Sequence, residues 1–200
     1  MCFRPFIPVK WCKSNRKETR KLLELGTILK NEPAAKDIYE MVLQVPGIAK
    51  KSKPGQFVNL RLSHKLDPLL RRPISLHGID PEKGTISMLY LVVGEGTSMM
   101  KDMEAGETID VLGPLGNGWN CEFEGSHAVL IGGGIGIAPL YPLAETLIKN
   151  GKDVELIVGA KNEAYLTDVS SYEKLGVRVT ITTDDGSAGI KGFVTTALAN

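Results

Sequence analysis

The sequence predicts a two-domain protein in which a six-stranded antiparallel β-barrel is followed by a parallel-sheet α/β domain. Six short apolar or alternating runs between residues 27 and 112 are separated by turn residues, as is typical of a barrel or sandwich. After residue 127, strand-like and helix-like runs alternate, which favours a parallel sheet covered by helices. The turn-rich stretch GPLGNG at 113–118 separates the two patterns. We therefore expect domains at 21–122 and 123–200, preceded by a basic extension at 1–20.

The elements of the two domains follow from these runs. The six strands of the barrel are expected at Thr27–Leu29, Ile38–Val45, Phe57–Leu62, Ile74–Ile79, Thr85–Val93 and Glu107–Leu112. The second domain is expected to have strands at Ala128–Ile131, Val154–Val158 and Val177–Thr182, and helices at Leu140–Lys149, Val169–Leu175 and Phe193–Leu198. A doubly wound nucleotide-binding domain normally has five or six strands. We therefore expect that the C-terminal part of this domain is truncated.

Composition limits the classes of function. The chain has 200 residues, 42% of them hydrophobic, and a formal net charge of +1, so neither nucleic acid nor a membrane surface is an expected partner. The three cysteines, Cys2, Cys12 and Cys121, are few and odd in number, which favours a reducing, cytoplasmic setting. Basic residues dominate positions 4–21, where we expect a disordered extension or, alternatively, a basic arm for a partner.

A glycine cluster follows the first expected strand of the second domain. In AVLIGGGIGIAPL, the residues Gly132, Gly133, Gly134 and Gly136 allow a sharp turn and a close approach of backbone to a ligand. A helix N-terminus after such a turn suits a pyrophosphate, although glycine-rich turns also occur without any ligand. The pattern G-x-G-x-x-G fails in both registers, since Ile137 or Pro139 takes the last position. An ordinary Rossmann dehydrogenase is therefore disfavoured.

Two stretches of the barrel carry further candidates for ligand binding. In LRRPIS, Arg72 offers a fixed charge suited to a phosphate, and Ser75 supplies a small hydroxyl, although a strand entering from a basic loop explains the same residues. In LYLVVGEGT, the ring of Tyr90 is available for stacking on an aromatic ligand, and Gly96-Thr97 opens a short helix with free N–H groups. Tyr90 is otherwise an ordinary packing residue of a strand.

Five stretches together resemble a known family. RRPISL, LYLVVGEGT, VLGPLGNGW, GGGIGIAPLYPLA and TTDDGSAGIKGFVT occur in the order found in the electron-transfer subunits of bacterial dihydroorotate dehydrogenase, which are ferredoxin-reductase-like flavoproteins. The resemblance covers roughly residues 21–200. It implies a flavin-binding barrel followed by a domain for a pyridine nucleotide. It also implies electron transfer through FAD to NAD in pyrimidine biosynthesis, with an FMN-containing catalytic subunit as the partner.

The resemblance also implies binding residues. Those for FAD would be Arg72, Pro73, Ile74, Ser75, Leu89, Tyr90, Leu91, Gly96 and Thr97, with Arg72 at the pyrophosphate, and those for NAD would be Gly132, Gly133, Gly134 and Gly136. The family usually has arginine where this chain has Leu91, which removes one expected phosphate contact. Asp184-Asp185-Gly186 is interpreted as a turn, and the resemblance places it near the nucleotide. Lys161 is weak evidence for a phosphorylated ribose, so NAD is preferred over NADP. No catalytic acid, base or nucleophile is expected.

The family also carries a [2Fe–2S] cluster on four cysteines near its C-terminus. This chain stops before that region, and its own three cysteines do not match the motif. We therefore expect either a fragment or a shortened relative. Two alternatives stay open: a reductase subunit of another complex, of the sulfide dehydrogenase, ferredoxin:NADP reductase or sulfite reductase type, or a flavin-free regulatory module that retains the fold.

Overall fold

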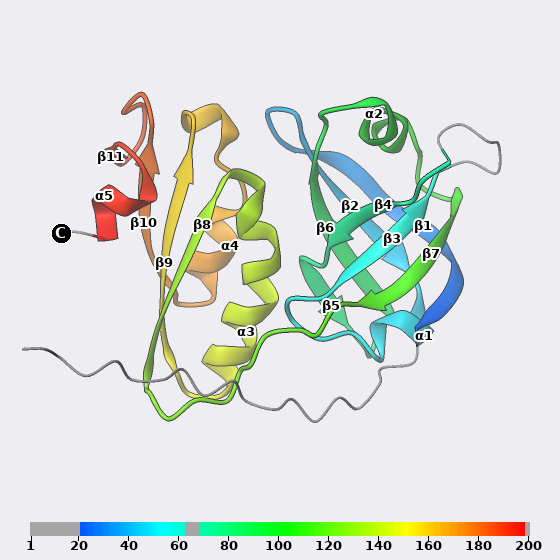
Figure 1. The fold of residues 1–200 in the computed structure, drawn as a ribbon, viewed down its shortest axis with the longest axis horizontal. Coiled ribbons are helices and arrows are strands. Elements are labelled where there is room, and N and C mark those ends of the chain that lie inside the picture. Colours follow the sequence, from blue (N-terminus) through cyan, green and yellow to red (C-terminus); the bar gives the residue numbers. More distant parts are fainter. Residues whose placement is uncertain (1–20, 63–68, 199–200) are drawn as a thin grey trace, which may run out of the picture.

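The computed structural model describes residues 21–62 and 69–198 and contains two sheets side by side (Figure 1). One sheet has seven antiparallel strands, and the other has four parallel strands. The basic N-terminal segment expected at 1–20, with Cys2 and Cys12, lies outside the described residues, as does His64. No helix in the described part is long and apolar enough to cross a membrane.

The antiparallel sheet occupies the first half of the chain. Its strands are β1 (Leu22–Ala35), β2 (Ile38–Gln44), β3 (Phe57–Arg61), β4 (Arg72–Ser75), β5 (Gly78–Asp80), β6 (Thr85–Leu91) and β7 (Thr108–Leu115), in the order β4-β3-β7-β1-β2-β6-β5. Helix α1 (Pro46–Ala49) follows β2, and helix α2 (Glu95–Lys101) follows β6. The expected fold class, an antiparallel β-sheet followed by a parallel α/β sheet, is confirmed.

The number of strands and the closure of the barrel differ from the expectation. The run predicted as one strand at 74–79 is two strands, β4 and β5, which lie at opposite ends of the sheet order. Between them, Leu76 N–H donates to Gln56 O at 3.0 Å, and His77 N–H donates to Ser87 O at 2.8 Å. The sheet therefore curls until its two edges meet at this corner, but no ladder joins β4 to β5 in the described residues.

The core of the antiparallel sheet explains which face of β6 points outward. Ile86, Met88 and Tyr90 alternate into a buried cluster that also contains Met100 of α2. Side chains of a strand alternate between its two faces. Ser87, Leu89 and Leu91 therefore form the opposite face of β6, which contributes to cavities against the second sheet.

The parallel sheet occupies the second half of the chain and has a core of its own. Its strands are β8 (His127–Gly133), β9 (Asp153–Ala160), β10 (Arg178–Thr183) and β11 (Ile190–Lys191), in the order β11-β10-β9-β8. Its helical segments are η1 (Gly134–Leu140), α3 (Tyr141–Lys149), η2 (Glu163–Tyr165), α4 (Val169–Lys174) and α5 (Val194–Leu198). In Figure 1, α3 and α4 lie between the two sheets and α5 lies on the opposite face. The strand β11, with two exposed residues in a glycine-rich stretch, was not expected from the sequence.

Candidate functional site

The glycine segment connects β8 to α3 through the 3₁₀ helix η1. Gly132 is a packing residue, because a Cβ there would lie 2.8 Å from Ile137 Cγ2 and 3.0 Å from Leu140 Cδ1. A Cβ on Gly133, Gly134 or Gly136 would meet no described heavy atom within 4 Å, and Gly134 has a φ of +53°, which favours glycine. The last three glycines therefore leave space that the protein itself does not fill.

Two cavities adjoin this segment. The first, which we name the antiparallel-sheet cavity, has a volume of about 410 Å³ and is lined by Arg72, Pro73, Ile74, Ser75, Leu89, Tyr90, Leu91, Val93, Thr97, Ile135, Gly136, Ala138 and Pro139. The second, the parallel-sheet cavity, has a volume of about 340 Å³ and is lined by Ile38, Leu91, Gly133, Gly134, Ile135, Gly159, Ala160, Lys161, Tyr165, Asp184, Phe193 and Val194. Two motifs separated in sequence, RRPIS and LYLVVGEGT, thus meet in the first cavity.

Two neighbouring arginines have different surroundings. Arg71 is held by the fold, since its Nη2 lies 3.0 Å from Asp110 Oδ2 and its Nη1 donates to Asn59 O. Arg72 lines the antiparallel-sheet cavity, where its guanidinium lies against Gly96 so closely that a Cβ on that glycine would overlap it. Gly96 therefore makes room for the charge of Arg72 at the first turn of α2.

Tyr90 and Thr97 line the antiparallel-sheet cavity, and their side chains are also bonded within the protein. The ring of Tyr90 is only 1% exposed, and its hydroxyl donates to Asn31 Oδ1 at 2.8 Å. Burial raises the pKa of Tyr90 to about 12. Most of the Tyr90 ring therefore packs into the core, although Tyr90 also lines the antiparallel-sheet cavity, and stacking on a ligand stays a prediction. The Thr97 hydroxyl is engaged within its own turn, where it accepts from the N–H groups of Val93 and Gly94.

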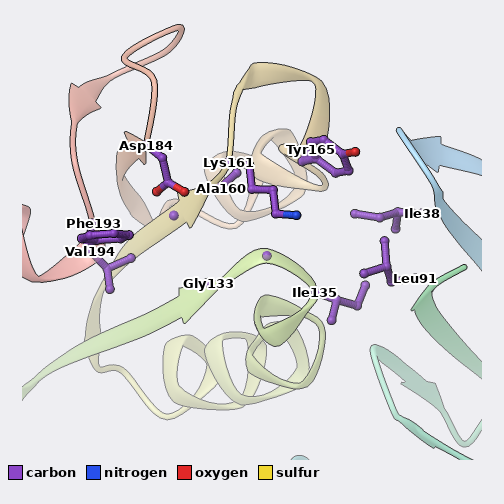
Figure 2. A pocket seen from close by; sticks show the side chains of 12 residues that line it. Ile38, Leu91, Gly133, Ile135, Ala160, Lys161, Tyr165, Asp184, Phe193 and Val194 are labelled. Carbon is purple, nitrogen blue, oxygen red and sulfur yellow. The ribbon is translucent and has the colours of Figure 1, made fainter. Parts of the chain in front are cut away.

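The parallel-sheet cavity combines an apolar wall with two opposite charges. Figure 2 shows the side chains of Ile38, Leu91 and Ile135 gathered on one side of the cavity and those of Phe193 and Val194 on the other. Lys161 and Asp184 supply the charges in its lining. The apolar side chains suit a flat apolar ring of a ligand, and the two charged side chains suit its polar groups.

Asp184 and Asp185, which follow β10, have different surroundings. Asp185 accepts hydrogen bonds from the N–H and the hydroxyl of Ser187, and the hydroxyl contact lowers its pKa. This is the turn expected from the sequence. Asp184 instead lines the parallel-sheet cavity, as the resemblance implied for this loop.

The two cavities share a wall. Leu91 of β6 and Ile135 of η1 line both cavities. On either side of Ile135, Gly133 and Gly134 face the parallel-sheet cavity, and Gly136 faces the antiparallel-sheet cavity. One segment thus serves two adjacent cavities, an arrangement suited to a reaction between two bound groups.

Comparison with known proteins identifies the family. Over 174 residues the chain is 41% identical to the dihydroorotate dehydrogenase B (NAD(+)) electron transfer subunit of Geobacillus sp. (strain WCH70), covering 86% of this chain and 67% of that protein. The identity to the subunit of the same name from Shouchella clausii is 42% over 175 residues, again with 67% of that protein covered. The chain belongs to this family. It spans about two thirds of the length of these relatives. No family model matches the chain.

Solved structures of related proteins have the same fold. An NADH-dependent reduced ferredoxin–NADP oxidoreductase superposes with a TM-score of 0.79 and 36% identity, over 88% of this chain and 62% of that one. A cytochrome P450 reductase from Amycolatopsis superposes with a TM-score of 0.74 and 25% identity, over 88% of this chain and 57% of that one. These likenesses confirm the ferredoxin-reductase-like fold and the assignment of the chain to the oxidoreductases.

The structure also adds residues to the site that the sequence analysis did not select. Ile38 enters the parallel-sheet cavity because it pairs with Leu91 across β2 and β6. Phe193 and Val194 come from the segment around α5, and Ala138 comes from η1. The alternation of β2 and β6 was a signal for Ile38, whereas the others depend on how the two halves of the chain pack.

The described residues do not provide an iron–sulfur site. Cys121 is the one cysteine among them, and burial raises the pKa of its thiol. Within residues 21–62 and 69–198, no group of three or more His, Cys, Asp or Glu side chains is arranged to hold a metal ion. The [2Fe–2S] cluster that the resemblance implies therefore has no ligand set among the described residues.

Proposed function

We propose that this chain is the flavin- and nucleotide-binding part of an electron-transfer subunit. In this role it passes electrons from an FMN-containing, dihydroorotate-oxidising catalytic subunit through FAD to NAD in pyrimidine biosynthesis. The single observation that carries the proposal is the pair of adjacent cavities that share Leu91 and Ile135. The relatives' names, which include NAD(+) and dihydroorotate dehydrogenase, support the choice of substrates.

The antiparallel-sheet cavity fits FAD. Its apolar side chains, such as Ile74 and Leu89, suit an isoalloxazine ring, and the guanidinium of Arg72 suits a pyrophosphate. Gly96 and Thr97 shape the turn beside Arg72, the first by leaving space and the second by closing the turn with its hydroxyl. When bound, FAD supplies the redox chemistry, and the protein supplies binding, orientation and exclusion of water.

The parallel-sheet cavity fits NAD. Gly133 and Gly134 present open backbone there, and Lys161 and Asp184 offer a donor and an acceptor for the polar parts of the nucleotide. Ile38, Leu91 and Ile135 form an apolar wall on the side shared with the other cavity, where they exclude water from between the two bound groups.

FAD binding by the purified chain tests this proposal. The protein should show flavin absorbance near about 450 nm or acquire it on addition of FAD. Arg72→Ala should weaken FAD binding roughly ten- to hundredfold, because it removes a charge-assisted phosphate contact of about 1.5–3 kcal/mol. Arg178→Ala is the matched control, since the Arg178 side chain is exposed, lies 3.1 Å from Asp153 Oδ2 and lines neither cavity. A chain that takes up no FAD, as a flavin-free regulatory module would, contradicts the proposal.

A second candidate keeps the cofactors and changes the partner. The 36% identity to an NADH-dependent reduced ferredoxin–NADP oxidoreductase favours a reductase subunit of a different complex as the alternative. Copurification decides between the two: the first candidate predicts a dihydroorotate-oxidising subunit with the chain, and the second predicts a ferredoxin-linked or sulfur-metabolising partner.

A further inference from the structure

His77 joins the two halves of the molecule at a buried position. It lies in the corner between β4 and β5 and is 6% exposed. Both of its ring nitrogens face oxygen atoms of the second half: Nδ1 lies 3.0 Å from Ala138 O, and Nε2 lies 3.1 Å from Asp168 Oδ2. Its ring packs on that of Tyr141, with centroids 5.0 Å apart. A single side chain thus contacts η1, α3 and the residue before α4.

The two oxygen atoms beside the His77 ring, Ala138 O and Asp168 Oδ2, differ in how they contact its nitrogens. A carbonyl oxygen only accepts hydrogen bonds, so Nδ1 carries the hydrogen that is donated to Ala138 O. Nε2 lies 3.1 Å from Asp168 Oδ2, a buried oxygen that has no aligned hydrogen bond among the described residues.

The segment held by His77 is the one that separates the two cavities. Two successive backbone carbonyls of η1 accept hydrogen bonds from side chains of other elements. Tyr172 Oη of α4 donates to Ile137 O at 2.8 Å, and His77 donates to Ala138 O. Burial raises the pKa of Tyr172, which keeps its hydroxyl a donor. Ala138 lines the antiparallel-sheet cavity, and Ile135, one helical turn earlier, lines both.

His77 is also fixed to the other wall. Its backbone N–H donates to Ser87 O of β6 at 2.8 Å, and Leu89 and Leu91, further along β6, line the antiparallel-sheet cavity. The β6 wall and the η1 wall are therefore connected through one buried residue. Displacement of η1 relative to β6 would change the distance between groups held in the two cavities.

We propose that His77 is a positioning residue for electron transfer. Through Ala138 and Asp168 it holds η1 against β6 and so fixes the separation and alignment of the flavin and the nicotinamide. His77 touches neither cofactor itself. This role rests on the proposed function, because it requires FAD in one cavity and NAD in the other.

A second link between the halves makes the role testable without loss of the fold. At the hairpin between β1 and β2, Lys36 N–H donates to Ala164 O at 3.0 Å, and Tyr165 Oη lies 3.4 Å from Asp37 Oδ2. This link does not involve His77. We therefore expect it to keep the two halves in contact in variants that lack the His77 contacts.

The test compares three variants of the purified, FAD-loaded chain. His77→Asn removes the contact with Asp168, and Asp168→Asn removes the charge at a position whose φ of +59° asparagine tolerates well. His127→Asn is the matched control, because His127 also lies 3.0 Å from an aspartate oxygen, that of Asp153, but is partly exposed and lines neither cavity. Should His77→Asn fail to fold, Asp168→Asn decides alone.

Two measurements separate the positioning role from the proposed function. His77→Asn and Asp168→Asn should speed amide hydrogen exchange across residues 134–140 and slow flavin reduction by saturating NADH about tenfold or more, at unchanged FAD content. The control should match the wild type in both. Reduction within about twofold of the wild type in both variants would overturn the positioning role alone. Failure of NADH to reduce the flavin in the wild type and in the control would instead overturn the proposed function.

Discussion

Gly132 and Gly133 are adjacent residues of β8 for which the structure predicts opposite effects of the same substitution. A Cβ on Gly132 would lie 2.8 Å from Ile137 Cγ2 and 3.0 Å from Leu140 Cδ1, so alanine there overpacks the contact between β8 and η1. Overpacking of this kind costs about 1–3 kcal/mol. Since a chain of this size loses about 2–4 °C of Tm per kcal/mol, Gly132→Ala should lower Tm by about 2–12 °C.

Gly133→Ala should leave the fold intact and weaken nucleotide binding. Its Cβ would meet no described heavy atom within 4 Å, and its φ of −112° suits any residue. Replacement of glycine by alanine at such a position stabilises by about 0.4–1 kcal/mol, so Tm should stay constant or rise by a few degrees. Because Gly133 lines the parallel-sheet cavity, we expect the added methyl to reduce NADH affinity about tenfold, which corresponds to about 1.4 kcal/mol.

Calorimetry and NADH titration of the FAD-loaded protein provide the assay for both variants, and each variant is the control for the other. Wild-type Tm in Gly132→Ala would refute the packing role of that glycine. Wild-type NADH affinity in Gly133→Ala would refute the assignment of the open glycines to the nucleotide, whatever the effect on Tm.

Two further predictions concern stability. Arg71→Ala should lower the unfolding free energy by about 3 kcal/mol, because it removes the guanidinium from the largely buried Asp110 carboxylate; urea denaturation measures this. The Tyr90 phenol has its pKa raised from 10.0 to about 12, so above pH 10 it ionises in the unfolded chain first. Wild-type stability should therefore fall by about 2–3 kcal/mol between pH 10 and 12, and Tyr90→Phe should lack this component; an equal fall in both proteins would contradict the assignment.

The sequence predicted the approximate positions of most strands but neither the length of β1 nor the corner at which the sheet turns. The strand expected at Thr27–Leu29 extends over Leu22–Ala35, because Asn31–Pro33 pair with β2 rather than forming a turn. The run at 74–79 was expected as one strand, since Leu76 between Ile74 and Ile79 continues its apolar pattern. Tertiary contacts divide this run: the Leu76 N–H donates to Gln56, the residue before β3, and the His77 N–H donates to Ser87 of β6, the strand next to the opposite edge. The pattern of apolar and polar residues along the sequence does not indicate which strands of a curled sheet will come into contact.

The motifs selected Arg72, Leu89 and Tyr90 from separate stretches, and all three line the antiparallel-sheet cavity, whereas their roles toward a ligand stay predictions. The alternation along β6 also places Tyr90 on the same face as Ile86 and Met88, so its ring packs mainly in the core. The role of Ile135 had no such signal, because it arises from the packing of η1 between the two sheets.

The shared wall has a thermodynamic consequence for the two proposed ligands. A group bound in either cavity contacts Leu91 and Ile135, which also bound the other cavity. If filling one cavity shifts either side chain, the fit of the second ligand changes, and linkage requires the reverse effect to be equal in free energy. Arg72 and Lys161 each line only one of the two cavities. We therefore expect substitutions at Arg72 or Lys161 to act mainly on the ligand of their own cavity, and substitutions at Leu91 or Ile135 to change the dependence of one affinity on the other.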